Sequence, residues 1–285
     1  MTRRLKDSLT IAFEIIGGIA TVFTIFGVSV STVFPLPKVN WVIKIEIYIF
    51  IVAFIYAFFV FAIWTIIGRK YKDSITFQIG RNTVTVKPGD IFKTSGWRVI
   101  PMDTTFSIDA DDKVISKNSL HGKLVLEHGN ADEIKKVVKS EAERRGFQED
   151  NGIYRFPFGA VIPYVCKEKD GQDASYLMVA MTALNENWEA HTNMAQYEHT
   201  LMEMWKEISR VYARNDIVLP LMGSGITRFD DNQDDPGSFL RCMLCTLNTS
   251  KLHLNSKITV LIYDDGKTNI PLYEYKELFR IARCQ

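Results

Sequence analysis

The sequence predicts a transmembrane hairpin of two helices followed by an α/β domain with three layers, α/β/α. Two apolar runs without any charge, 15–34 and 47–67, stand in the first quarter of the chain. Each is long enough to cross a hydrocarbon core of about 30 Å as a helix. Nearly all charged residues follow Gly68, where apolar strands alternate with amphipathic helices. We expect the hairpin at 1–72, with spans at about 9–34 and 41–67, and the domain at 73–285.

Basic residues flank the hairpin at its two outer ends. The turn between the runs has only Lys38, whereas the outer ends carry Arg3, Arg4, Lys6, Arg69, Lys70 and Lys72. The positive-inside rule therefore places both termini in the cytoplasm and makes the chain a multi-pass protein of the inner membrane. A secretory signal peptide would also begin with basic residues, but the first run is too long for one and a second run follows it.

Small residues recur along the first span, several of them four positions apart: Gly17, Gly18, Thr21, Gly27 and Ser31. Such spacing lets transmembrane helices approach closely. We expect self-association into a homo-oligomer. Packing of the two spans within one chain explains the same spacing equally well.

The composition excludes several classes of function. Because 34 basic residues balance 33 acidic ones, a general nucleic-acid surface is not expected. The four cysteines would lie in a reducing compartment, where a disulfide framework is not expected. Cys242 and Cys245 form a C-x-x-C pair on the apolar face of a predicted helix, without further ligands at zinc spacing. No metal site is predicted.

The first half of the domain begins with strands and ends with a helix. Alternating or β-branched residues predict strands at 74–79, 83–86 and 97–100, and the polar stretch 110–123 is predicted as a loop. A capping box at Asn130–Glu133 begins a helix of regular apolar spacing that Gly146 stops. Apolar runs then predict strands at 160–165 and 176–184.

The second half alternates strands and helices. One apolar stripe over 193–212, with a period typical of core packing, predicts a long helix. An apolar strand at 217–221 leads to a glycine loop, and Asp235–Pro236 then caps a helix that runs to about Leu247. A buried strand at 257–263 and a helix at 272–281 complete the domain. Ligands of such folds bind beyond the carboxyl ends of the strands.

The glycine loop, 219–229, is the candidate ligand loop. A strand that ends in glycines before a helix often presents backbone amides to a phosphate, although a Gly-x-Gly turn is as often only a tight connection. Gly223 and Gly225 would admit a diphosphate, Ser224 and Thr227 add hydroxyls, Arg228 adds charge and Phe229 an aromatic ring. The chain has no G-x-S-x-G or H-E-x-x-H pattern, so hydrolytic catalysis of those kinds is not predicted.

These motifs carry a resemblance to a known family. The order of a Gly89-Asp90-Ile91 turn, a strand that ends at Pro101-Met102-Asp103, a polar loop and the run from Pro220 to Phe229 resembles the macro domain, a module for ADP-ribose. Two membrane spans ahead of a divergent macro domain resemble the membrane-bound effectors of type II Thoeris anti-phage systems. The resemblance covers essentially the whole chain.

The resemblance implies roles for individual residues. Asp90 matches the acid that accepts the adenine amino group, and Ile91 the backbone contact beside it. The loop around the diphosphate and distal ribose matches Gly223, Ser224, Gly225, Ile226, Thr227, Arg228 and Phe229. Asp103 stands where hydrolases of the family carry an asparagine, and Leu120, His121 and Gly122 lie near their first glycine-rich phosphate loop. These departures favour a receptor over a hydrolase, with Asp103 and His121 reading a modified distal end.

The function that the resemblance implies is signalling rather than catalysis, without a cofactor. The domain would sense an ADP-ribose derivative, histidine-linked, that a partner TIR-domain enzyme makes from NAD. Binding would bias an oligomer towards a state that disrupts the lipid bilayer, leading to abortive infection. Two alternatives are a membrane-tethered ADP-ribosyl hydrolase and a membrane anchor that binds protein alone.

Overall fold

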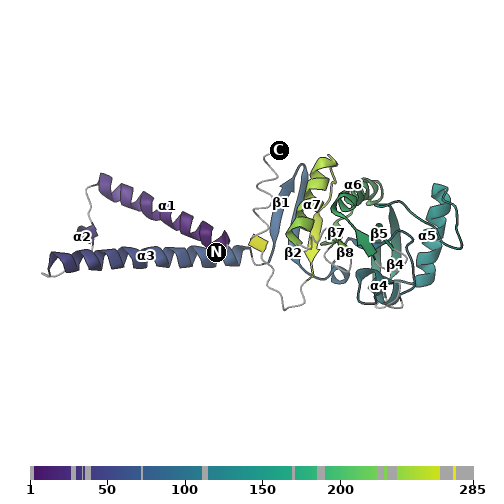
Figure 1. Cartoon of the computed structure of the whole chain (residues 1–285), viewed down its shortest axis with the longest axis horizontal. Coiled ribbons are helices and arrows are strands. Elements are labelled where there is room, and N and C mark those ends of the chain that lie inside the picture. Colours follow the sequence, from purple (N-terminus) through teal and green to yellow (C-terminus); the bar gives the residue numbers. More distant parts are fainter. Residues whose placement is uncertain are drawn as a thin grey trace. The chain divides into compact units, whose positions relative to one another are not determined.

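The structure, a computed structural model, describes residues 3–26, 30–33, 35, 40–71, 73–110, 115–168, 171–184, 190–223, 228–229, 236–263 and 272–273 (Figure 1). The chain forms two compact units. The first consists of Met1–Asp73 together with Pro271–Glu274, and the second of Ser74–Ile270 with Tyr275–Gln285. We call them the hairpin unit and the sheet unit.

The hairpin unit contains α1 (Arg3–Ile25), the short α2 (Val30–Val33) and α3 (Trp41–Lys70). Helices α1 and α3 are long and apolar enough to cross a membrane, with mean hydropathies of 1.8 and 2.6. Asn40 caps α3 by accepting from the Val42 amide. Within the first span predicted at about 9–34, α1 ends at Ile25 and α2 occupies Val30–Val33.

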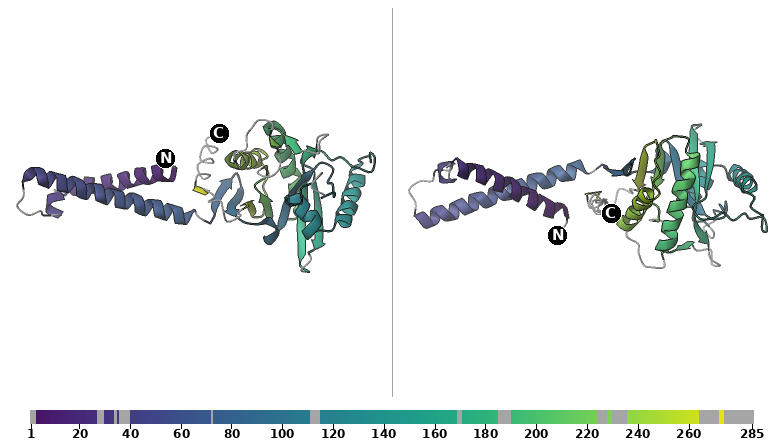
Figure 2. Two further views of the ribbon diagram at one scale, coloured as in Figure 1. Left: turned by 60° about the horizontal axis from the view of Figure 1, so that its bottom comes forward. Right: turned by 90° about the horizontal axis from the view of Figure 1, so that it is seen from above.

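The two long helices cross each other (Figure 2). The hydroxyl of Tyr56 on α3 donates to the carbonyl oxygen of Leu9 on α1 at 3.1 Å, and Ser8 and Ala12 of α1 are buried. Farther along α1, no atom lies within 4 Å of a Cβ built at Gly17 or Gly18. These two glycines therefore do not serve the contact between α1 and α3 in one chain.

The sheet unit contains nine described strands. They are β1 (Ile75–Ile79), β2 (Asn82–Pro88), β3 (Trp97–Asp103), β4 (Val161–Lys167), β5 (Asp173–Leu184), β6 (Ala190–Thr192), β7 (Ile217–Pro220), β8 (Arg228–Phe229) and β9 (Ile258–Ile262). The order is β1-β2-β9-β7-β3-β5-β6-β8, with β4 beside β5. Strands β2, β9, β7, β3 and β5 are parallel neighbours, and β1 and β4 pair antiparallel at the flanks.

Helices cover both faces of the sheet (Figure 2), which confirms the predicted three-layer fold. One face carries the 3₁₀ turn η1 (Ile91–Lys93), α4 (Leu120–Lys123), the π-helical turn η2 (Leu124–His128) and α5 (Ala131–Arg145). The other face carries α6 (Met194–Val211) and α7 (Pro236–Thr249). A hydrogen bond joins these two helices, because the Trp205 indole donates to Thr246 Oγ1 at 3.2 Å. Ile100 and Met102 occupy alternate positions of β3, so both side chains point to the same face of the sheet. There they pack in one core with η1 and α5.

Three local predictions need correction or fall outside the description. The loop predicted over 110–123 is helical from Leu120, because the Ser119 hydroxyl accepts from the Gly122 amide and caps α4. The short strands β6 and β8 were not predicted. Of the helix predicted over 272–281, only Leu272 and Tyr273 lie among the described residues.

Candidate functional site

The parallel strands end along one edge of the sheet, and the predicted site residues follow these ends. Leu261 near the end of β9 pairs with Lys87 and with Pro220. The Gly89 amide donates to the Ile262 carbonyl oxygen at 3.0 Å, and the Leu221 amide to that of Leu261 at 2.8 Å. The turn after β2 and the loop after β7 therefore lie on either side of the end of β9. This edge is the candidate ligand edge.

Asp90 forms the first wall of the ligand edge. One carboxylate oxygen, Oδ1, accepts from the Phe92 amide at 3.0 Å and so caps η1. The Thr94 hydroxyl donates to the Asp90 carbonyl oxygen at 2.9 Å, which closes the turn. The other oxygen, Oδ2, lies 3.8 Å from Lys93 Nζ, and the side chain is 35% exposed. Ile91 is buried, and its carbonyl oxygen accepts from the Thr94 amide at 3.3 Å. The turn thus presents an oriented carboxylate.

The glycine loop is anchored where the structure describes it. Gly223 has φ +86°, a conformation that favours glycine. The Tyr197 hydroxyl of α6 donates to the Met222 carbonyl oxygen at 2.9 Å, and its burial raises the pKa of that hydroxyl. At the far end, backbone pairing joins Arg228 and Phe229 of β8 to β6. Residues 224–227 lie outside the described residues.

Asp103 and His121 come together although eighteen positions separate them. They are 4% and 7% exposed, and His121 Nδ1 lies 3.8 Å from Asp103 Oδ2. Asp103 Oδ1 accepts from the Thr105 amide at 2.7 Å and from its hydroxyl, and Oδ2 accepts from the Ser107 amide at 3.3 Å. His121 Nε2 lies 2.7 Å from the Ser107 carbonyl oxygen. The pair therefore fixes the chain after β3 against α4.

The residues on either side of His121 are also structural in this arrangement. Leu120 packs against the core. There is no room for a side chain at Gly122, because a Cβ there would lie 2.3 Å from the Ser116 carbonyl oxygen. The close approach of two backbones explains why this position carries glycine.

The pH dependence of stability tests the His121 environment. Burial lowers the pKa of the imidazole below its usual 6.5, against the opposing effects of the Asp103 carboxylate and the Ser107 carbonyl. Between 6.5 and that lowered value the unfolded state alone binds a proton, so the free energy of unfolding falls as pH falls. We expect the melting temperature to drop from pH 7.5 to pH 5.5, and to drop less in His121→Gln. Equal drops in the two proteins would contradict this assignment.

The structure adds two residues that sequence reasoning did not single out. Tyr263 directly follows β9 at the ligand edge and is 67% exposed. Lys123 of α4 places its Nζ 5.9 Å from the centre of the Tyr263 ring. The sequence signal for Tyr263 is an aromatic residue at the last position of the predicted strand 257–263.

Behind the Asp90 turn, aromatic stacking supports η1. The Phe92 ring lies parallel to the imidazole of His128, the last residue of η2, with centroids 3.9 Å apart. Arg98 of β3 donates from Nε to the Thr94 carbonyl oxygen at 2.7 Å and pairs with Glu168 at 2.5 Å. The Phe92–His128 stack and the Arg98 hydrogen bond therefore hold the turn in place.

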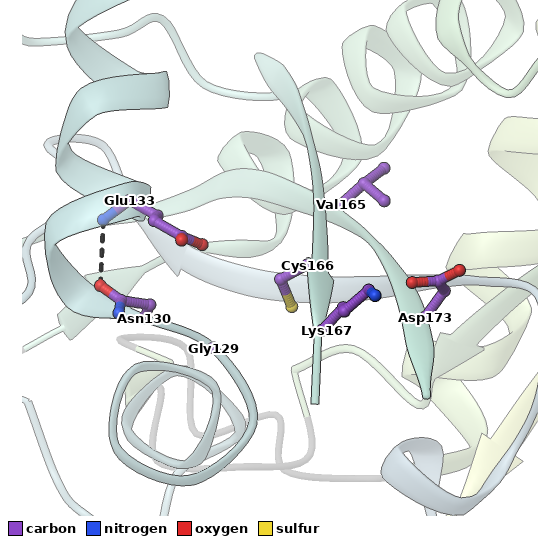
Figure 3. Close-up of a pocket in the computed structure, with 7 residues that line it drawn as sticks. All are labelled: Gly129, Asn130, Glu133, Val165, Cys166, Lys167 and Asp173. Atoms are coloured by element: carbon purple, nitrogen blue, oxygen red, sulfur yellow. Dashed lines mark hydrogen bonds between the residues drawn. The ribbon is translucent and has the colours of Figure 1, made fainter. Parts of the chain in front are cut away.

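A depression of about 670 Å³ lies on the sheet unit away from the ligand edge (Figure 3). It is lined by Gly129, Asn130, Glu133, Val165, Cys166, Lys167 and Asp173. Asn130 accepts from the Glu133 amide within it. Lys167 pairs with Asp173 where β5 begins, so the depression is at the opposite edge from Gly223 and Asp103. It is separate from the candidate site.

The described residues contain no group of three or more His, Cys, Asp or Glu that could hold a metal ion. Cys242 is buried on α7, and its burial raises the pKa of the thiol to about 12. A thiol with that pKa is neutral at physiological pH and a poor nucleophile. The C-x-x-C pair is thus part of the packing of α7.

A protein-family model matches more than half of the chain. Residues 84–263 match the family described as "Thoeris protein ThsA, Macro domain". The chain is 26% identical over 214 residues to Thoeris protein ThsA of Bacillus amyloliquefaciens (strain Y2), covering 73% of this chain and 71% of that protein. Among solved structures it is similar to the Oceanobacillus iheyensis macrodomain with ADP, with a TM-score of 0.47 and 15% identity. The match covers 73% of this chain and 96% of that one. The chain is also similar to the same macrodomain with MES bound, with a TM-score of 0.47 and 16% identity. This match covers 73% of this chain and 96% of that one.

Proposed function

Because this chain belongs to the macro domain family of the Thoeris protein ThsA, we propose that it senses an ADP-ribose nucleotide and disrupts a membrane in response. It would thereby act in bacterial defence against phage. The sheet unit would be the sensor and the hairpin unit the effector, divided at residues 72 and 73.

The observation that carries the proposal is the convergence of Asp90, Gly223 and Tyr263 at the ends of neighbouring parallel strands. In our proposal Asp90 Oδ2 accepts the adenine amino group, the Ile91 backbone contacts the base, and the exposed Tyr263 ring stacks on it. Gly223 begins the loop that surrounds the diphosphate and distal ribose, continued by Ser224, Gly225, Ile226, Thr227, Arg228 and Phe229. The ligand is an ADP-ribose derivative, and no cofactor is required.

We propose binding without hydrolysis. A general base needs a free lone pair within reach of a water molecule. Asp103 and His121 are only 4% and 7% exposed, so water has little access to their lone pairs, and Asp103 Oδ1 already accepts two hydrogen bonds from Thr105. In this proposal Asp103 and His121, with Leu120 and Gly122, shape the wall beside the distal end of the ligand.

Family membership and the two long apolar helices support the partners that we propose. We propose that a TIR-domain enzyme makes the signal from NAD, in a histidine-linked form, and that the chain lies in the inner membrane with both termini cytoplasmic. Gly17 and Gly18 of α1, which face open space in one chain, would contact a second copy in a homo-oligomer. A nearly complete switch requires the nucleotide to favour one state by about 5.5 kcal/mol.

Calorimetric titration with ADP-ribose tests this division of labour. We expect the detergent-solubilised whole chain and a chain that begins at Ser74 to bind ADP-ribose with affinities within roughly threefold of each other, because the site residues all lie in the sheet unit. Only the whole chain should release dye from lipid vesicles when nucleotide is added. Absence of heat with ADP-ribose and with its histidine-linked form would overturn the proposal.

A further inference from the structure

Strand β4 lies at an edge of the sheet. It pairs antiparallel with β5, in a register that places Tyr164 opposite Tyr176 and Val165 opposite Ser175, and no other described strand pairs with it. In an antiparallel pair, residues that bond to the neighbouring strand alternate with residues whose amide and carbonyl point away from it. One set of β4 backbone groups therefore points away from the sheet.

Hydrogen bonds at both ends of β4 show which residues form this outward set. The Ala180 amide donates to the Ala160 carbonyl oxygen at 2.9 Å, and the Glu168 amide donates to the Gln172 carbonyl oxygen at 2.8 Å. Since the register is the same throughout, the even-numbered residues of β4 bond to β5 and the odd-numbered residues point outward. Pro163, which has no amide hydrogen, belongs to the outward set.

The outward groups are covered at one end of β4 and open at the other. Arg145 Nη2 of α5 donates to the Val161 carbonyl oxygen at 3.0 Å and to Glu207 Oε2 of α6 at 2.8 Å, so this side chain crosses the edge. At the other end, none of the described residues bonds to the outward amide or carbonyl of Val165 or Lys167. We call these two residues the open edge of β4.

There is space for another strand beside the open edge. The depression of about 670 Å³ is lined by Val165 and Lys167 together with the start of α5. The side chains of Val165 and Lys167 project to one side of β4, and that of Cys166 projects to the other (Figure 3). Val165 is apolar and β-branched, yet it is 61% exposed. An uncovered strand edge with such a residue favours pairing with another chain.

We propose that the open edge pairs with the open edge of a second copy, antiparallel and around a two-fold axis at Cys166. In this register Val165 lies opposite Lys167 of the second copy on both sides of the axis. Each outward amide then meets an outward carbonyl, and Pro163 is left outside the pairing. The edge is therefore complementary to itself, as an interface with two-fold symmetry requires.

A second copy fits the open edge better than a flexible peptide does. The edge offers the backbone groups of only two residues, and ordering a flexible peptide costs conformational entropy at every residue. Strand β4 of a second copy is already ordered by its pairing with β5, so it binds without that cost. If the hairpin unit holds the copies in one membrane, their effective concentration is also raised.

The pairing goes beyond the proposed function and does not depend on a nucleotide. It adds a contact between sheet units to the contact between hairpin units that we propose at Gly17 and Gly18. A two-fold contact alone closes as a dimer. Two different contacts between copies would join such dimers into a larger assembly in the membrane.

Amide hydrogen exchange of the detergent-solubilised whole chain tests the pairing residue by residue. The amides of Tyr164 and Cys166 bond to β5 within one copy, so they should exchange slowly and serve as internal controls. The amides of Val165 and Lys167 should exchange as slowly as the controls, to within roughly tenfold, because a second copy accepts from them. Exchange at both positions as fast as in an unstructured peptide would overturn the proposal.

Val165→Pro and Val165→Thr form a matched pair of variants. Proline removes the outward amide, and β4 already carries Pro163 among its outward residues. Threonine keeps both the amide and the β-branched shape. Because the two-fold axis repeats each hydrogen bond, proline should weaken the pairing by roughly ten- to a hundredfold.

The exchange rate of the Lys167 amide measures this loss. It should be at least about tenfold faster in Val165→Pro than in Val165→Thr, while the Tyr164 and Cys166 amides remain protected in both. A Lys167 amide that is equally protected in the two variants would show that its partner lies within the same chain, which would overturn the proposal.

Cys166 reports on the register in the wild-type chain. In the proposed pairing the two Cys166 residues lie directly opposite each other at a site without hydrogen bonds, with Cα atoms about 4.5 Å apart. A disulfide spans that distance. Oxidation of the whole chain with copper phenanthroline should therefore give a dimer, with the Cys166–Cys166 peptide identified by mass spectrometry, and Cys166→Ala should abolish that peptide.

A dimer linked through other cysteines alone would overturn the register. The exchange and oxidation experiments contain no nucleotide. A failure of ADP-ribose to bind would therefore overturn the proposed function and leave the result on β4 unchanged.

Discussion

Replacing Gly223 by valine is expected to weaken ADP-ribose binding by roughly a hundredfold or more, because the change acts on both the shape and the space of the loop. Gly223 adopts φ +86°, which a β-branched residue disfavours strongly. Relaxation to a negative φ would redirect the peptide groups that follow the Met222 anchor. A Cβ would also stand where the proposed diphosphate approaches the backbone. Calorimetry on the whole chain measures the loss.

A matched control for backbone strain is Gly171→Val. Gly171 has φ +84° and open space around its Cβ position, and it precedes β5, away from the ligand edge. The Gly171→Val variant should lose about as much free energy of unfolding as Gly223→Val, on the order of 1–3 kcal/mol, while it keeps its nucleotide affinity. If Gly223→Val and Gly171→Val bind ADP-ribose equally well, the loop after β7 does not hold the ligand.

The second large effect is expected at Asp90. In Asp90→Asn, the side-chain oxygen still accepts from the Phe92 amide and caps η1, whereas the atom at Oδ2 becomes an amide donor. A donor facing the adenine amino group leaves both groups without an acceptor, which should weaken ADP-ribose binding by roughly ten- to a hundredfold. The same variant should gain affinity for inosine diphosphate ribose, whose 6-oxo group accepts a hydrogen bond.

The control for this charge change is Asp216→Asn. Asp216 also uses Oδ1 to accept from a backbone amide, that of Lys257 at 3.0 Å, but it precedes β7 at the opposite edge of the sheet. It should retain the preference for adenine. If Asp90→Asn shows no change of preference between the two nucleotides, Asp90 does not read the base.

Features with local causes could be predicted from the sequence. The apolar runs of α1 and α3, the Asn130 cap of α5 and the stripe of α6 each depend on residues within a few turns. The three-layer fold follows from the alternation of such elements, and the Asp90 turn from its place after a strand. Family membership, confirmed by the match over 84–263, depended on the order of two short motifs.

Features that depend on contacts between distant residues could not be predicted. The sequence around Asp103 does not indicate that His121 lies close to it. Nor does it indicate that polar atoms of Asp103 and His121 contact Thr105 and Ser107. The first turn of α4 depends on the Ser119 cap and on the backbone approach at Gly122, which only the fold creates. Tyr273 likewise meets Asp7 across nearly the whole chain.

The π-helical turn η2, between α4 and α5, has a consequence for the support of the Asp90 turn. In an α-helix, residues five apart point in different directions, but the wider i to i+5 winding brings them onto nearly one face. The Gly129 amide, which donates to the Leu124 carbonyl at 2.7 Å, shows this winding. Lys123 near the Tyr263 ring and His128 on the Phe92 ring are five apart in this segment. One helical turn thus approaches two aromatic residues at once, Phe92 after Asp90 and Tyr263 after β9.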